Sequence, residues 1–154
     1  MRPGRFNKSK ALELGVPEGP LFGKLQRGYS VTLNDGRTIT PDMVLGPARP
    51  GRKIVISGDT RPSEKMVSFA RYADALIHEA TFTSDLSNIS YEYGHTTAEE
   101  AAKIAKEAEV ERLFLIHISP RYLDNNILEM EARKIFPDTL VPKDLQEIDI
   151  PLKK

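Results

Sequence analysis

From residue 53 onward, short apolar runs alternate with amphipathic segments. Apolar runs rich in β-branched residues and leucine predict three core strands, at residues 54–57, 75–80 and 112–119. Segments with helical spacing predict three helices, at residues 63–71, 97–108 and 125–136. Strands that alternate with helices favour an α/β fold in which the helices cover a sheet.

Helix-capping residues support these boundaries. Ser63 stands where the first helix should begin, and Thr97 and Glu100 have the spacing of a capping box. Behind this box, alanines recur on one face of the helix, which predicts close packing against a neighbour. Pro137 is expected to end the last helix.

Residues 1–52 have a different pattern, with small local elements and few candidate core positions. Asn7 predicts the cap of a short helix over residues 8–14, and residues 16–28 predict a compact loop with one helical turn. Two alternating runs, 29–33 and 37–40, flank a turn sequence and predict a hairpin. This segment therefore looks like an appendage or insertion.

The composition limits the kinds of site that are possible. The chain has 154 residues, 40% hydrophobic and 29% charged, which is ordinary for one globular domain. It has no cysteine, so a metal must be held by histidine or carboxylate side chains. No apolar stretch approaches the roughly 18 residues of a membrane span, and no signal peptide is recognisable, so a cytoplasmic location is expected.

The charge is unevenly distributed along the chain. The net formal charge is zero, but residues 1–53 hold 10 Lys and Arg against 4 Asp and Glu, a net charge of +6. A basic segment of this kind can bind a polyanion, and it can equally be a solvated surface with no partner. The charge alone leaves both interpretations open.

Polar residues follow each predicted strand. Asp59 comes after the first strand, His78 and Glu79 end the second, and His117 lies in the third; His95 precedes the capped helix. In layered α/β proteins the carboxyl ends of the strands form the ligand-binding edge, so Asp59, Glu79 and His117 should meet there. Carboxylate and imidazole groups are suitable ligands for zinc or manganese.

Each of these residues also has a simpler explanation. Asp59 follows a glycine and can be a turn residue, a histidine in a strand can be a hydrogen-bonded core residue, and Glu79 can pair with a lysine. The residues before Thr97 can be only a helix entry. Because the positions occur together at successive element ends, they favour a site, and the residues alone indicate a metal-assisted hydrolase.

Four stretches carry a more specific resemblance. They are SGDTRP (57–62), LIHEATF (76–82), YGHTTAEEAAKIAKEA (93–108) and LFLIHISPRY (113–122). In this order and spacing, and with the front segment RPGRFNKSKALELGVPEGPLFGKLQRG, the chain resembles the C-terminal half of ribonuclease Z. That family consists of tRNA 3′-processing endonucleases of the metallo-β-lactamase superfamily.

The resemblance implies a fold and roles for individual residues. The fold would be half of a metallo-β-lactamase-like αββα sandwich. Asp59 resembles the carboxylate that bridges two zinc ions, and His117 resembles the last histidine ligand of the second ion. Glu79 and His95 resemble a hydrogen-bonded pair in which the histidine protonates the leaving ribose oxygen. His78 is expected to support the site without binding metal, and Thr96 stands where the family usually has serine.

The resemblance also divides the chain into two parts. Residues 1–52 resemble the arm that grips tRNA away from the active site, and residues 53–154 resemble the C-terminal half of the catalytic domain. Candidate RNA-binding residues of the arm are Lys8, Lys10, Lys24 and Arg27, and Gly19-Pro20 resembles its tip. The implied partner is precursor tRNA, and the family is typically homodimeric.

One hallmark of the family is absent from the sequence. The His-x-His-x-Asp-His motif, which supplies four ligands, does not occur among the three histidines of the chain. Two expected ligands, Asp59 and His117, cannot close a tetrahedral zinc site. We therefore expect the chain to be inactive alone. It is interpreted as part of a longer enzyme, as one subunit of a split enzyme, or as a non-catalytic RNA-binding remnant.

Overall fold

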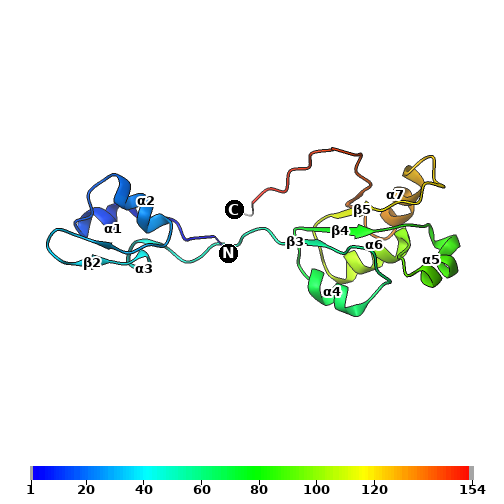
Figure 1. Cartoon of the computed structure of the whole chain (residues 1–154), viewed down its shortest axis with the longest axis horizontal. Coiled ribbons are helices and arrows are strands. Elements are labelled where there is room, and N and C mark those ends of the chain that lie inside the picture. Colours follow the sequence, from blue (N-terminus) through cyan, green and yellow to red (C-terminus); the bar gives the residue numbers. More distant parts are fainter. Residues whose placement is uncertain (1, 153–154) are drawn as a thin grey trace. The chain divides into compact units, whose positions relative to one another are not determined.

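The computed structural model describes residues 2–152, which divide into two compact units, one before and one after the junction of Gly51 and Arg52 (Figure 1). The first unit contains α1 (Lys8–Glu13), α2 (Pro20–Gln26), β1 (Val31–Thr32), β2 (Thr38–Ile39) and α3 (Pro41–Val44). The second contains β3 (Ile54–Ile56), α4 (Glu64–Ala70), β4 (Ala75–Glu79), the 3-10 helix η1 (Ser84–Leu86), α5 (Ser87–Tyr93), α6 (Ala98–Glu107), β5 (Leu113–Ile116), α7 (Asn126–Arg133) and β6 (Thr139–Leu140). No helix of the described residues is long and apolar enough to cross a membrane.

The first unit has its own small core, which the sequence did not predict. Side chains from all of its elements are buried together: Ala11, Val16, Leu25, Val31, Ile39 and Val44. The segment after Val16, predicted as a loop with one turn, instead contains the seven-residue helix α2, which begins at Pro20. Proline at this position suits a helix start because its missing N–H group needs no partner there. The unit is therefore a small folded body.

The two ends of the first unit run antiparallel to each other. Arg2 pairs with Arg49 and Phe6 with Leu45, and backbone hydrogen bonds join the two segments. Gly4 lies at the closest approach, where an added Cβ would stand 1.8 Å from the carbonyl oxygen of Gly46. Only glycine fits at this position without moving the backbone.

The second unit is built on a parallel four-stranded sheet in the order β3-β4-β5-β6. Helices α4, α6 and α7 follow or precede these strands along the chain, which confirms the predicted α/β organisation. The predicted cap at Ser63 and the capping box of Thr97 and Glu100 are both present. The fourth strand, β6, was missed because two residues carry no periodicity. Helix α5 was missed for a related reason, since it buries only Ser90.

One face of this sheet packs against helices. Its core is formed by strand residues Val55, Leu76, Leu113 and Leu115 and by the alanines of α6. The side chains alternate along each strand, so the other face carries Ile54 and Ile56, which remain 48% and 63% exposed. This side of the sheet is therefore apolar and partly open at β3.

Candidate active site

The carboxyl ends of three parallel strands bring the predicted site residues together. Ile56 pairs with Ile77 and Glu79 pairs with Ile116, so the ends of β3, β4 and β5 lie side by side. Asp59 and His117 follow the ends of β3 and β5, and Glu79 is the last residue of β4. The structure thus places these three residues at one edge of the sheet, as the strand pattern predicts.

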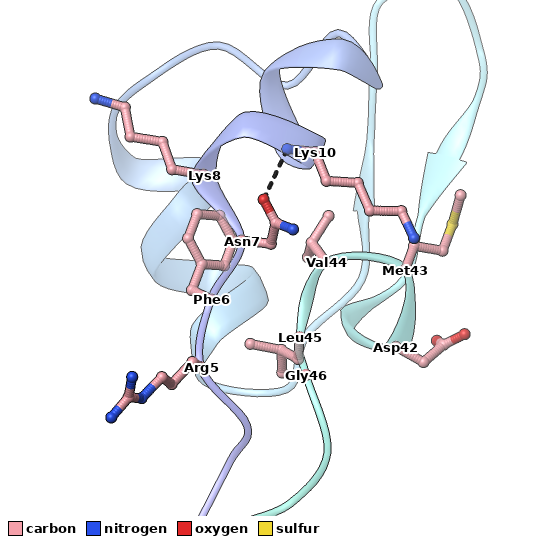
Figure 2. Close-up of a pocket in the computed structure, with 10 residues that line it drawn as sticks. All are labelled: Arg5, Phe6, Asn7, Lys8, Lys10, Asp42, Met43, Val44, Leu45 and Gly46. Carbon is pink, nitrogen blue, oxygen red and sulfur yellow. Dashed lines mark hydrogen bonds between the residues drawn. The ribbon is translucent and has the colours of Figure 1, made fainter.

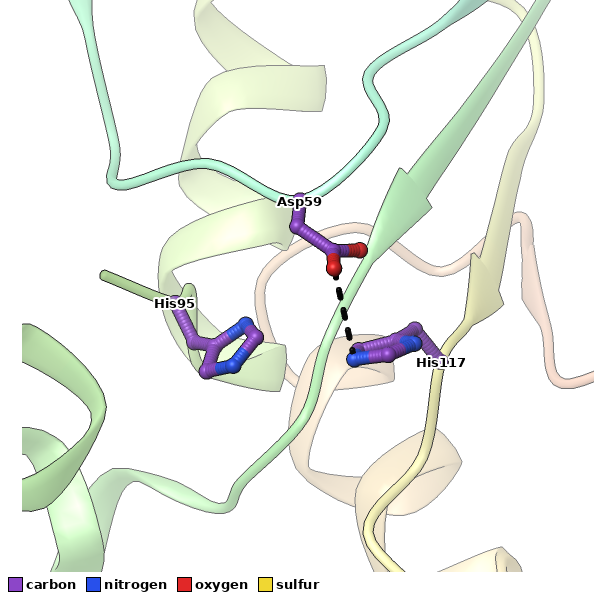
Figure 3. Close-up of side chains that lie close together, drawn as sticks. All are labelled: Asp59, His95 and His117. Carbon is purple, nitrogen blue, oxygen red and sulfur yellow. Dashed lines mark ion pairs between the residues drawn. The ribbon is translucent and has the colours of Figure 1, made fainter. Parts of the chain in front are cut away.

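Asp59 and His117 face each other across this edge. The carboxylate Oδ2 of Asp59 lies 3.7 Å from Nε2 of His117. The backbone is unusual at both positions. Gly58, which precedes Asp59, has a φ of +62°, and His117 itself has a φ of +57°. A positive φ is uncommon for a residue with a side chain, and such strain concentrates at functional sites. Here it turns the imidazole away from the strand and toward Asp59 (Figure 3).

Glu79 is fully buried and lies behind His95. Its Oε1 accepts hydrogen bonds from Nδ1 of His95 at 3.1 Å and from the backbone N–H of Thr60 at 2.9 Å. Its Oε2 accepts from the hydroxyl and the backbone N–H of Thr81, at 2.9 and 3.3 Å. These donors compensate for the burial of the carboxylate and fix its position. The expected hydrogen bond between Glu79 and His95 is present, and the catalytic role of the pair remains a prediction.

Thr96 holds the turn that carries Asp59. Its hydroxyl is fully buried and donates to the carbonyl oxygen of Thr60 at 2.6 Å. Thr60 is the neighbour of Asp59, and its N–H is already bonded to Glu79. Both polar groups of the Thr60 backbone are therefore held by the elements that position His95. The hydrogen bond between Thr96 and Thr60 was not predicted. Its only signal in the sequence is that a threonine stands next to Asp59 and another next to His95.

Asp59, His95 and His117 form a donor set suited to a metal ion. One potential ligand atom of each residue lies within 4.8 Å of the others (Figure 3). The rings of His95 and His117 are 5.3 Å apart, and Phe82 contacts His95 edge-on. Two imidazoles and one carboxylate fit a divalent transition metal, and they leave coordination positions open. The residues present therefore fit a metal, while supplying only part of a two-metal site.

His78 lies outside this donor set. It is fully buried, its Nδ1 bonds to the carbonyl oxygen of Glu79 at 2.8 Å, and its Nε2 has no hydrogen-bond partner among the described residues. Burial lowers the pKa of His78 below its ordinary value. The supporting role of His78 stays a prediction.

The four candidate RNA-binding residues all lie exposed in the first unit. Lys8 pairs with Glu18 at 2.9 Å, Lys10 belongs to α1, and Lys24 and Arg27 lie in and just after α2. Lys8 and Lys10 also line an open hollow of about 520 Å³ (Figure 2). Arg5 and Phe6 line the same hollow and were not among the predicted residues.

The comparisons with known proteins agree with this fold. Residues 27–118 match the family described as "Beta-lactamase superfamily domain". Over 97% of its length, the chain is 50% identical to ribonuclease Z of Archaeoglobus fulgidus and covers 49% of that protein. Over 98% of its length, it is 51% identical to ribonuclease Z of Gemmatimonas aurantiaca and covers 48% of that protein.

A solved structure gives the same result. The crystal structure of the short form of human tRNase Z superposes with a TM-score of 0.53 at 33% identity, covering 66% of this chain and 34% of that one. The chain therefore spans about half the length of the curated relatives that it matches.

Proposed function

The chain belongs to the beta-lactamase superfamily and is homologous to about half of ribonuclease Z, and we propose that it supplies half of a zinc-dependent tRNA 3′ endonuclease. In the completed enzyme it would help to remove 3′ trailers from precursor tRNA. The observation that supports this most is the contact between the buried Glu79 and His95, directly beside Asp59 and His117. An imidazole whose orientation is fixed by a carboxylate thus lies beside two potential metal ligands.

Each residue has a defined part in this proposal. Asp59 and His117 would hold metal at the edge of the sheet. Zinc bound there would supply an activated water and would stabilise charge on the phosphate. His95 lies beside the leaving 3′-oxygen of the ribose and donates a proton to it. Glu79 holds Nδ1 of His95, so that the ring presents Nε2 for this transfer.

Completion by a second half is part of the proposal, because the chain lacks the histidine-rich motif that supplies most of the ligands. The apolar sheet face at Ile54 and Ile56 supports it, since a second sheet would bury those side chains. The missing half is either the remainder of a longer chain or a separate subunit. A homodimer and a cytoplasmic location belong to the same proposal.

The first unit would bind the tRNA body as an exosite. The net charge of +6 over residues 1–53 and the exposed Lys8, Lys10, Lys24 and Arg27 favour contacts with phosphates, which position RNA without reading its sequence. A second candidate function follows from the same surface. With the arm folded and the ligand set incomplete, the chain would be an RNA-binding module without catalysis.

Cleavage of precursor tRNA separates these two functions. The chain is assayed alone and fused to the half of the Archaeoglobus fulgidus ribonuclease Z that it does not match. We expect no cleavage by the chain alone and zinc-dependent cleavage by the fusion at the 3′ end of the tRNA. A correctly folded fusion that binds tRNA and zinc but does not cleave would instead support the RNA-binding module.

A further inference from the structure

We propose that Tyr91, with the guanidinium of Arg61 packed on one face of its ring, is a stacking site for an unpaired nucleobase of single-stranded RNA. The two residues belong to the second unit and are separate from the basic residues of the first unit. The stacking site rests on the proposed function only in taking RNA as the ligand, and every residue that forms it belongs to this chain.

The first argument is the way in which Arg61 is held. Its Nε donates to the carbonyl oxygen of Tyr91 at 2.7 Å, and its Nη2 donates to that of Glu92 at 3.3 Å, both near the end of α5. Its Cζ lies 4.9 Å from the centroid of the Tyr91 ring. Two hydrogen bonds and a cation–π contact thus fix the guanidinium and the ring against each other, which reduces the entropy lost when a ligand binds.

The second argument is the exposure of the ring. Tyr91 is 69% exposed although Arg61 covers one side of it, so the opposite side faces solvent. Proteins bind unpaired bases by stacking them on aromatic rings of this kind, because every base has a π-face. The free face of Tyr91 therefore offers a place for one base.

The third argument is the charge beside the ring. Within residues 2–152, Arg61 forms no ion pair with a carboxylate, and its two hydrogen bonds go to carbonyl oxygens. Its positive charge is therefore available to a phosphate of the strand whose base stacks on Tyr91. A base inside a duplex is already paired and stacked, so this combination favours a single strand.

The fourth argument is the position of the pair along the chain. Arg61 comes two residues after Asp59, and α5 ends at Gly94, whose φ of +82° turns the chain into His95. Figure 1 shows α5 beyond the carboxyl end of β4. Both segments that form the stacking site thus continue into the candidate active site. A base stacked on Tyr91 would belong to the part of the RNA near the bond that the proposed enzyme cleaves.

The same unit contains a matched comparison for Tyr91. Tyr72 is 60% exposed, and the Cζ of Arg71 lies 5.9 Å from the centroid of its ring. The guanidinium of Arg71 makes no hydrogen bond within the described part of the chain. Tyr72 also precedes β4, whereas the candidate active site follows the end of that strand. It therefore offers similar exposure without a fixed guanidinium and away from the site.

The full chain is titrated against a short single-stranded RNA that carries one 2-aminopurine between uridines. The fluorescence of 2-aminopurine falls when this base stacks, and the anisotropy of an end-labelled copy of the strand gives the affinity. We expect Tyr91→Ala to remove most of the quenching at saturation and to weaken binding by about fivefold or more, the scale of one lost stacking contact. Tyr91→Phe keeps the aromatic ring, so both it and the control Tyr72→Ala should stay within about twofold of the parent chain.

Unchanged quenching and affinity in Tyr91→Ala would overturn the stacking site and leave Arg61 as a cap of α5 alone. A parent chain that does not quench the probe overturns it as well, and so does a Tyr72→Ala variant that loses as much as Tyr91→Ala. Far-ultraviolet circular dichroism verifies that each variant is folded, and Tyr91→Leu carries the same expectation if Tyr91→Ala is not. The result is independent of cleavage. A fusion that cleaves, together with a Tyr91→Ala chain that still quenches the probe, would reject only the stacking site, and quenching by Tyr91 without cleavage by the fusion would reject only the nuclease.

Discussion

Oε1 of Glu79 accepts a hydrogen bond from Nδ1 of His95 and a second one from the N–H of Thr60, the residue next to Asp59. One oxygen atom therefore fixes both the imidazole and the turn that carries the predicted metal-binding carboxylate. Removal of Glu79 should affect proton transfer and metal binding together. From the sequence, only the first of these effects was expected.

The pairing of Glu79 with His95 predicts non-additive losses. In a fusion completed with the missing half, His95→Ala should lower the single-turnover cleavage rate by about 10²–10⁴, the usual scale of general acid catalysis. Glu79→Ala should lower it at least as much, and the double variant should be little worse than Glu79→Ala, because the residues act as one unit. Rates measured for the three variants check this. Losses that simply multiply would show that the two side chains act independently.

The clamp between Thr96 and Thr60 predicts a specific effect on stability. Thr96→Val has nearly the same shape but cannot donate to the Thr60 carbonyl oxygen, so the free energy of unfolding should fall by about 1–3 kcal/mol. Thr96→Ser keeps the hydroxyl and should lose clearly less. Urea unfolding of the two variants provides the measurement. A loss in Thr96→Val that is no larger than the loss in Thr96→Ser would contradict the proposed role of the hydroxyl.

The basic first unit predicts salt-sensitive RNA binding. The affinity of the chain for tRNA should fall steeply as salt rises, because phosphate contacts release counterions. Lys24→Ala combined with Arg27→Ala should reduce the salt slope by about 2, since each contact contributes about one unit. Lys106→Ala, an exposed lysine of α6 in the second unit, is the matched control. An unchanged slope in the double variant would exclude these two residues as phosphate contacts.

The buried His78 predicts that stability falls in mild acid. Burial lowers its pKa in the folded chain from the ordinary value of 6.5, so the unfolded chain binds the proton more strongly. The contribution of His78 is complete above about pH 6.5, and it is lost as the pH falls from there toward the pKa of the folded state. His78→Gln should flatten this part of the stability curve. Chemical unfolding at several pH values tests the difference, and identical slopes would contradict it.

The sequence predicted most of the second unit because its signals are local. The capping residues Ser63 and Thr97 and the apolar strand runs identify helices and strands, and parallel strands then bring Asp59, Glu79 and His117 to one edge. The resemblance, not the spacing, supplied the pairing of Glu79 with His95, which are 16 positions apart.

Other features depend on contacts between distant segments. The bond from Thr96 to Thr60 spans 36 positions, and His117 has a positive φ, which is uncommon for a residue with a side chain. Neither has a periodic or compositional signal. The small core of the first unit was missed because its buried residues are spread over five short elements, each too short to show a pattern.

The most direct test of the account compares His95→Ala with His117→Ala in the completed fusion, by zinc content after dialysis and by single-turnover cleavage of precursor tRNA. The account predicts that His117→Ala loses zinc and activity together, because that imidazole holds metal. It predicts that His95→Ala keeps zinc and tRNA binding while cleavage falls by about 10²–10⁴. Loss of zinc in His95→Ala with retention in His117→Ala would reverse the two assignments and contradict the proposed site.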